Sequence, residues 1–357
     1  MKPDSKIKEL TGKCLLITDP FITTYTQHAH LLSILSGHER LQPWIFSNYI
    51  QLYINRDYIH NWGDFYFPCS YDLRPSDTCP WIHSQKIDRG LINRRWDSVT
   101  DFIIENINEN NYIQIMVNCY YISVHERYKN ENRMHDLFIY GYDLEREVLY
   151  ASDFFNKGKY SNKEITFTDF NKAYSEYDSA INHDYLFGLV YMYRLNSDCN
   201  YIFNIQNIIN SIDSYLTCRI PEYWDIFNRE DLYRIVFGRE IYATLKNYLQ
   251  REIFTNESGF ERRPFHLLYD HKKMMSLRIK FLYEQGVLDE TIASNNIFRE
   301  LEELARNIIY LLIKYQVSRK KSIVTDKIPS LLNEIEEKEF DCLSALVSSL
   351  RHSLHAK

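Results

Sequence analysis

The chain has little glycine and proline, no Cys-x-x-Cys pair, no long apolar run and no excess of positive charge. Only 10 of its 357 residues are glycine and 9 are proline, which disfavours long linkers and predicts well-ordered elements. The seven cysteines are an odd number with irregular spacing, so neither a disulfide framework nor a zinc site is predicted. Reduced thiols in the cytoplasm are expected instead.

The lack of a long apolar run and of excess positive charge disfavours roles in membranes and in nucleic-acid binding. No stretch approaches the roughly 20 apolar residues of a membrane span, and the first residues lack the apolar core of a signal peptide. The net charge of −6 gives no broad basic surface for nucleic acid. We therefore expect a cytoplasmic protein that acts without membrane, nucleic acid, metal or cofactor.

Apolar periodicity changes near residue 200. Before it, a helix is predicted over 26–36 and another from an N-cap at Asp97 to Ile107. Strands are predicted over 112–117, 137–142, 147–151, 164–168 and 186–195, and residues 43–54 fit helix or strand. The stretch from there to about 95 looks irregular.

After residue 200 the period is that of helices. These are predicted over 202–218, 230–252, 271–286, 296–318, 326–336 and 338–353. The sequence thus indicates an α+β domain over 1–198 and an all-helical bundle domain over 199–357.

The most chemically suggestive feature is a histidine and an aspartate at opposite ends of one hairpin-like stretch. His135 opens the first apolar strand and Asp153 closes the second, 153 − 135 = 18 residues later. Adjacent antiparallel strands can bring two such residues side by side. A carboxylate that fixes the tautomer of an imidazole is the arrangement of a general base and its orienting acid. The alternative is a surface histidine at a strand start and an aspartate that caps the next turn.

Residues 13–195 resemble papain-like domains of two related groups. The motifs are His135-x-x-Phe-Ile-Tyr-Gly-Tyr-Asp143, Tyr150-Ala-Ser-Asp153-Phe and the helix over 26–36. One group trims leader peptides in bacteriocin exporters, and the nearer one is the N-terminal domain of butirosin biosynthesis protein H and its relatives. More loosely, 237–249 and 263–278 resemble the helical partner domain of such proteins.

The resemblance implies a papain-like fold and acyl transfer in bacterial specialised metabolism, along a nonribosomal-peptide or aminoglycoside pathway. An acyl or peptidyl carrier protein would be the partner, its thioester the donor and an amine the acceptor. His135 would be the base and Asp153 its orienting acid. In the family, a cysteine at the N-terminus of the first long helix is the nucleophile, because that position favours the thiolate.

No cysteine stands at that place in this chain. The matching stretch is Thr23–His30, and our alignment puts Thr26 at the position of the nucleophile. Three interpretations remain open. Thr26, His135 and Asp153 form a hydroxyl triad; the site is degenerate and the protein is a scaffold that binds a carrier protein or peptide; or another residue, such as Cys14, Cys69 or Cys119, enters the site.

Other histidines carry weaker signals. His28 and His30 would point about 200° apart on a helix, so we expect one to face the site and one the surface rather than a shared metal. His125 is expected to be a solvated loop residue. His266, His271, Lys272 and Lys273 are interpreted as a solvated helix face, the alternative being a basic edge for an acidic carrier protein.

Overall fold

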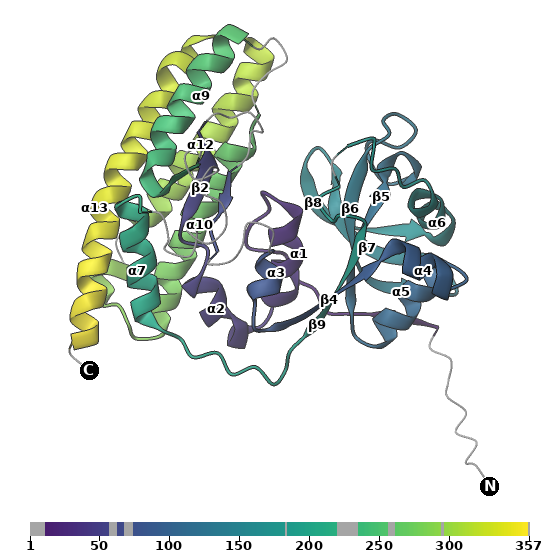
Figure 1. Cartoon of the computed structure of the whole chain (residues 1–357). Coiled ribbons are helices and arrows are strands. Elements are labelled where there is room, and N and C mark those ends of the chain that lie inside the picture. The colour runs from purple at the N-terminus through teal and green to yellow at the C-terminus, as the bar shows by residue number, and fades with distance from the viewer. Residues whose placement is uncertain are drawn as a thin grey trace. The chain divides into compact units, whose positions relative to one another are not determined.

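The computed structural model describes residues 11–56, 63–67, 74–182, 184–219, 235–255, 261–293 and 296–355. It contains two compact units (Figure 1), each formed by two segments of the chain. Unit 1 comprises Met1–Gly37 and Pro75–Cys199, and unit 2 comprises His38–Arg74 and Asn200–Lys357. The predicted mixture of an α/β region and a C-terminal helical region is confirmed.

Unit 1 is built on a seven-stranded antiparallel sheet. The strand order is β4-β9-β5-β6-β7-β8, with the short β1 paired to β6. The strands are β1 (Gly12–Cys14), β4 (Ile82–Asp88), β5 (Tyr112–Asn118), β6 (Met134–Asp143), β7 (Val148–Asn156), β8 (Lys159–Thr166) and β9 (Leu189–Leu195). Strands that the sequence indicated after residue 110 are present, whereas β4 lies in the stretch expected to be irregular.

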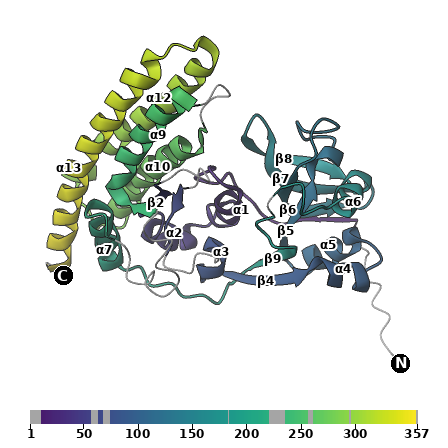
Figure 2. The same cartoon turned by 45° about the horizontal axis from the view of Figure 1, so that its top comes forward.

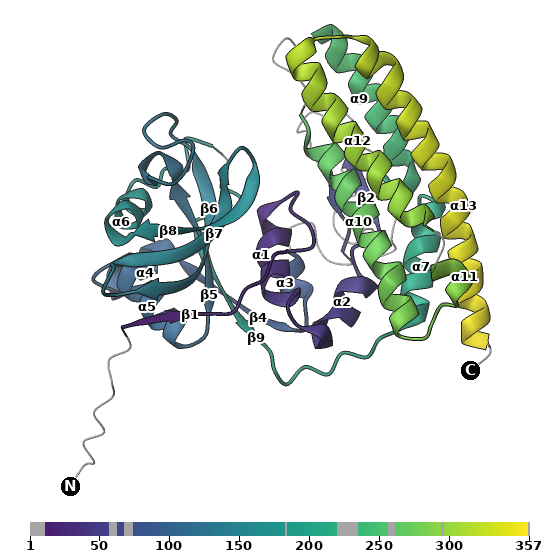
Figure 3. The ribbon, with the colours of Figure 1, turned by 180° about the vertical axis from the view of Figure 1, so that it is seen from behind.

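Helices cover both faces of this sheet. Figures 1 and 3 show α5 (Val99–Asn108) and α6 (Phe167–Ser175) on one face and α1 (Thr26–Leu35) on the other. The short helices α3 (Pro75–Thr78) and α4 (Arg89–Arg95) flank β4. Ser98, rather than the predicted Asp97, caps α5, because its hydroxyl accepts the Asp101 N–H at 3.1 Å.

The glycine of the Gly-Tyr-Asp motif is required by close packing of strands. Gly141 lies beside a bulge in the β6–β7 pairing, and β1 runs next to it. A Cβ at this position would lie 2.7 Å from the Lys13 carbonyl oxygen, too close for any side chain. The motif therefore has a structural reason for its glycine, separate from any chemistry at His135.

Unit 2 is mainly a bundle of long helices. Helix α10 packs on α12, α12 on α13, and α13 on α7 and α9 (Figures 2 and 3). Their bounds are α7 (Ile205–Leu216), α9 (Ile241–Thr255), α10 (Arg263–Glu284), α12 (Ile297–Ser318) and α13 (Ile328–His355), with the short α11 (Glu290–Ala293) between α10 and α12. The two helices predicted over 326–336 and 338–353 are one, because neither glycine nor proline interrupts the chain between them.

The segment 38–74 belongs to unit 2, not to the contiguous domain 1–198 that the sequence indicated. Residues 43–54 supply α2 (Gln42–Ser47) and β2 (Leu52–Asn55), so both interpretations of this stretch hold in part. Strand β2 pairs with β3 (Gly63–Phe65) and with β10 (Ile235–Phe237). Strand β10 lies inside the predicted helix 230–252, whose first residues, 230–234, fall outside the described residues.

Two buried side chains of α10 bind the backbone of this early segment. The Arg278 guanidinium donates to the carbonyls of Phe46 at 2.8 Å, Asn48 at 2.6 Å and Tyr49 at 3.0 Å. His271 Nε2 donates to the Ile50 carbonyl at 2.7 Å. Carbonyls at the end of α2 carry partial negative charge, which stabilises a buried cation. Burial lowers the pKa of Arg278 to about 9, so it is still charged at neutral pH.

A second charged cluster of unit 2 is fully enclosed. Lys272 Nζ contacts Glu339, the Tyr215 hydroxyl at 3.4 Å and His271 Nδ1 at 2.9 Å. Glu339 also accepts from Tyr215 at 2.8 Å and Tyr242 at 2.7 Å. The expected solvated face is therefore wrong for His271 and Lys272, which are buried. The alternative of a basic edge is wrong for them too, because their polar groups bind within the bundle.

The Lys272–Glu339 pair predicts a large effect of removing one charge. In Glu339→Gln the buried ammonium of Lys272 loses its carboxylate, so the free energy of unfolding should fall by about 3–5 kcal/mol. Lys280→Met, which removes the exposed pair with Glu284 on the same helix, should change it by less than about 0.5 kcal/mol. Urea denaturation followed by circular dichroism checks both. Equal effects of the two variants would contradict this account.

Candidate active site

The paired strands bring His135 and Asp153 into direct contact. His135 lies near the start of β6, and its Nδ1 is 3.0 Å from both carboxylate oxygens of Asp153 on β7. Asp153 is fully buried, while about a quarter of the His135 side chain is exposed. The imidazole is thus held at Nδ1, and its side chain remains partly exposed. This is the geometry required of a general base held by an acid.

The charge of Asp153 determines the protonation state of His135. Burial lowers the pKa of His135, but the charge and hydrogen bond of Asp153, helped by Asp136, outweigh it and raise that pKa to about 9. His135 is therefore protonated at neutral pH and becomes a free base only in alkaline solution.

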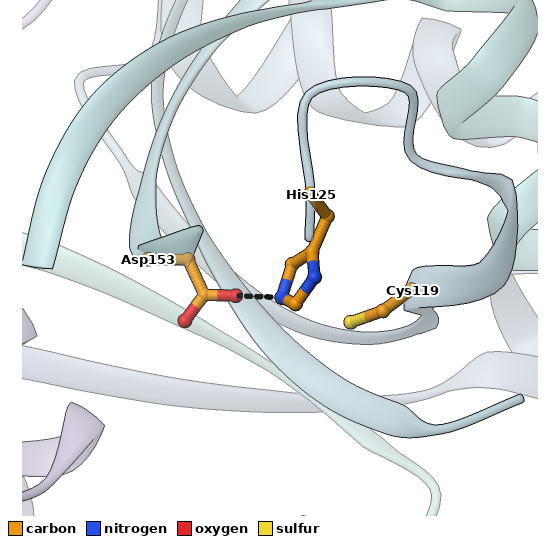
Figure 4. A group of neighbouring side chains, drawn as sticks. All are labelled: Cys119, His125 and Asp153. Carbon is orange, nitrogen blue, oxygen red and sulfur yellow. Dashed lines mark ion pairs between the residues drawn. The ribbon is translucent and has the colours of Figure 1, made fainter. Parts of the chain in front are cut away.

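A second histidine, His125, lies near the same carboxylate (Figure 4). His125 Nε2 is 3.9 Å from Asp153 Oδ2, and Asp153 Oδ1 accepts the N–H of Phe154 at 2.6 Å. The Arg127 N–H donates to His125 Nδ1 at 3.1 Å, which places the ring proton on Nε2, facing Asp153. His125 is buried, so the expectation of a solvated loop residue is wrong. Its burial could not be read from the chain because it depends on the path of the loop after β5.

Cys119 is the third member of the group in Figure 4. It opens the 3-10 helix η2 (Cys119–Tyr121) directly after β5, and its side chain is fully buried. Burial, followed by the charge of Asp153, raises the pKa of its thiol well above the usual value. A buried thiol that resists ionisation is a poor nucleophile. Burial also raises the pKa of the Cys14 thiol, and Cys69 lies outside the described residues.

Cys119, His125 and Asp153 carry ligand atoms within 4.8 Å of one another, so a metal must be considered. A metal at this place would take a thiolate, an imidazole and a carboxylate, which is a donor set that zinc accepts. A metal would also need the lone pair of His125 Nε2, but the Arg127 N–H occupies Nδ1 and leaves the proton on Nε2. The donor set is therefore arranged for hydrogen bonding rather than for a metal.

Thr26 is the first residue of α1 and is buried. In the described part of the chain no hydrogen bond joins Thr26 to His135. The structure therefore brings together two of the three predicted catalytic residues, His135 and Asp153. Thr26 lies at the first residue of α1, without a hydrogen bond to His135 among the described residues.

One turn beyond Thr26, His30 connects α1 to the sheet. His30 Nε2 is 3.3 Å from Asp136 Oδ2, its Nδ1 is 2.8 Å from the Tyr160 hydroxyl, and its ring stacks on Phe138. His28 and His30 are both buried, so the expectation that one of them faces solvent is wrong. His30 instead anchors the helix that carries Thr26.

Asp136 is a functional-site residue that the sequence analysis missed. It adjoins His135 and accepts hydrogen bonds from Gln114 and Tyr185. Burial opposes its charge, yet His30, His135 and Tyr185 hold the pKa of Asp136 well below its usual value. A charged residue within an apolar strand was the available signal, because a buried carboxylate needs partners.

Comparison with known proteins adds no family assignment. No protein-family model matches the chain, and no curated protein matches it either. No helix of the described residues is long and apolar enough to cross a membrane.

Replacing Asp153 should lower the pKa of His135. In Asp153→Asn the negative charge is lost while the shape is kept, so the pKa should fall from about 9 to about 7 or lower, because an adjacent opposite charge accounts for about 1–3 units. Titration of the histidine ring protons by NMR measures it. Asp143→Asn, a change at the far end of β6 from His135, is the matched control and should leave the pKa of His135 unaltered.

The same pair predicts how stability depends on pH. The folded-state pKa of His135, about 9, exceeds its ordinary 6.5. The contribution of protonated His135 to the free energy of unfolding is therefore complete below pH 6.5 and is lost as the pH rises through 9. Asp153→Asn should flatten this part of the profile of unfolding free energy against pH. A wild-type profile as flat as that of the variant would contradict the assignment.

Proposed function

We propose that this chain is a cytoplasmic papain-like protein of the acyltransferase type. It moves an acyl group from a carrier-protein thioester to an amine in bacterial specialised metabolism. The observation that carries the proposal is the 3.0 Å contact between His135 and the buried Asp153. The motifs shared with the butirosin biosynthesis protein H group and the position of α1 support the same assignment.

His135 supplies proton transfer in this reaction. In its neutral form it accepts a proton from the attacking amine while the nitrogen bonds to the thioester carbonyl carbon. The carbon–sulfur bond then breaks, and His135 returns the proton to the departing thiolate. Asp153 keeps Nδ1 protonated and stabilises the imidazolium that forms in between.

Thr26 defines a second route through a covalent intermediate. Its hydroxyl would attack the thioester first, give its proton to His135 and form an ester that the amine then cleaves. A hydroxyl needs a closely bonded base to react, and Thr26 makes no hydrogen bond to His135. We therefore favour direct attack by the amine, and Thr26→Val separates the two routes.

The rival function is a scaffold that binds a carrier protein or peptide without turnover. Two points favour it: our alignment puts the buried Thr26 at the position of the family's cysteine, and a pKa raised to about 9 leaves His135 protonated at neutral pH. A fixed imidazolium is a poor base but a suitable partner for an anionic group.

Amide formation from an acyl-loaded carrier protein and a free amine tests the proposal. The rate should increase from pH 7 towards pH 9 as His135 loses its proton, and His135→Ala should reduce it by about 100-fold or more. The exposed His83 provides the matched control, His83→Ala, with unchanged rates. Thr26→Val should retain activity if the amine attacks directly and abolish it if Thr26 is acylated.

Two outcomes would overturn acyl transfer. One is a rate in His135→Ala within twofold of the parent. The other is no product at any pH up to 9.5 together with carrier binding that survives His135→Ala, which assigns the chain to the scaffold function.

A further inference from the structure

A hollow of about 190 Å³ lies in unit 1, beside the loop that carries His125. Its walls come from residues 120–129 and from α6. One water molecule takes about 30 Å³, so the hollow could hold about six, the space of a small organic molecule or one end group. It is smaller than the roughly 300 Å³ of a typical drug-sized site.

Groups that donate hydrogen bonds face this hollow without partners from the protein. Tyr120, Tyr121 and Tyr128 line it together with Thr168 and Lys129. Within the described residues, the hydroxyl groups of the three tyrosines and Thr168 have no hydrogen-bond partner. The Lys129 ammonium has no hydrogen-bond or ion-pair partner there either. The three tyrosines are half-buried, while Lys129 and Thr168 are exposed. Hydroxyl donors and a cation gathered at one place are suited to an oxyanion.

The other two charged side chains at the rim of the hollow have partners within the protein. Lys172 forms an ion pair with Glu176 one turn along α6, and Asp169 accepts the Ser123 N–H at 3.2 Å. Lys129 is therefore the cation left for a ligand among these rim residues. Its ammonium lies 5.0 Å from the centre of the Tyr128 ring, so the cation and an aromatic face are presented together. Lys129 also holds a left-handed backbone conformation, φ 53°, which its N–H bond to the Tyr120 carbonyl at 3.0 Å supports.

We propose that this hollow binds an aromatic carboxylate. The carboxylate pairs with Lys129 and the tyrosine hydroxyls, and the ring packs against the tyrosine rings, which prefer offset or edge-on partners. A cation is disfavoured, because Lys129 and Lys172 already lie over the faces of Tyr128 and Tyr121. A free aromatic acid and a peptide that ends in phenylalanine present the same chemistry. The site does not depend on the acyl-transfer proposal.

Ligand-observed NMR titration of the full chain tests this site. Benzoate should bind saturably, and benzamide, which lacks the charge, at least five-fold more weakly. Lys129→Gln should weaken benzoate binding by at least five-fold and Tyr128→Leu by at least three-fold. Lys163→Gln removes an equal charge from an exposed lysine of β8 and should leave the affinity unchanged.

The same titration distinguishes a free acid from a peptide terminus as the ligand, and it can also contradict the proposal. A tripeptide ending in phenylalanine that binds more tightly than benzoate, and loses this advantage when amidated, identifies a peptide terminus. Tighter binding of benzoate identifies a free acid. No saturable binding of either carboxylate, or equal weakening by Lys129→Gln and Lys163→Gln in folded protein, would overturn the proposal.

Discussion

The candidate site depends on one buried carboxylate. Asp153 has no access to water, so it must be neutralised by donors from the protein. His135 and the Phe154 N–H donate to it, and His125 directs its own N–H towards it. These three come from β6, from β7 and from the loop after β5. The carboxylate thus fixes the ring of His135 and draws the loop of residues 119–130 against the sheet.

The chain contains two clusters in which buried charged groups are hydrogen-bonded, one around Glu339 and one around Asp153. The two clusters differ in what they can do. Lys272 and Glu339 are enclosed on every side, and all the donors and acceptors around them are used within the bundle. That cluster determines how helices pack and offers nothing to a substrate. His135 differs because Asp153 holds its Nδ1 while about a quarter of its side chain is exposed. An accessible, oriented and titratable group is what proton transfer requires.

The sequence predicted those parts that local patterns determine. Alternation located β5 to β7, and the spacing of His135 and Asp153 predicted their contact, because hairpin partners are near in the chain. Residues 38–74 could not be placed, because their partners Arg278 and His271 are more than 220 residues away. Lys272 looked like a surface residue because Lys273 follows it and Glu339 is distant. The burial of His125 and the role of Asp136 were missed for a related reason, because the contacts that make these residues significant are tertiary.

The insertion of residues 38–74 between the two parts of unit 1 has a consequence for synthesis of the chain. This segment leaves the ribosome before α10, because the partner of Ile50 lies 221 residues later in the chain and that of Phe46 lies 232 residues later. At about 5–20 residues per second, the delay is roughly 10–45 s. During that time the aromatic side chains of Trp44, Tyr49 and Phe65, buried in the finished protein, have no partner from α10. The nascent chain must therefore keep this apolar segment from aggregating until α10 has been made.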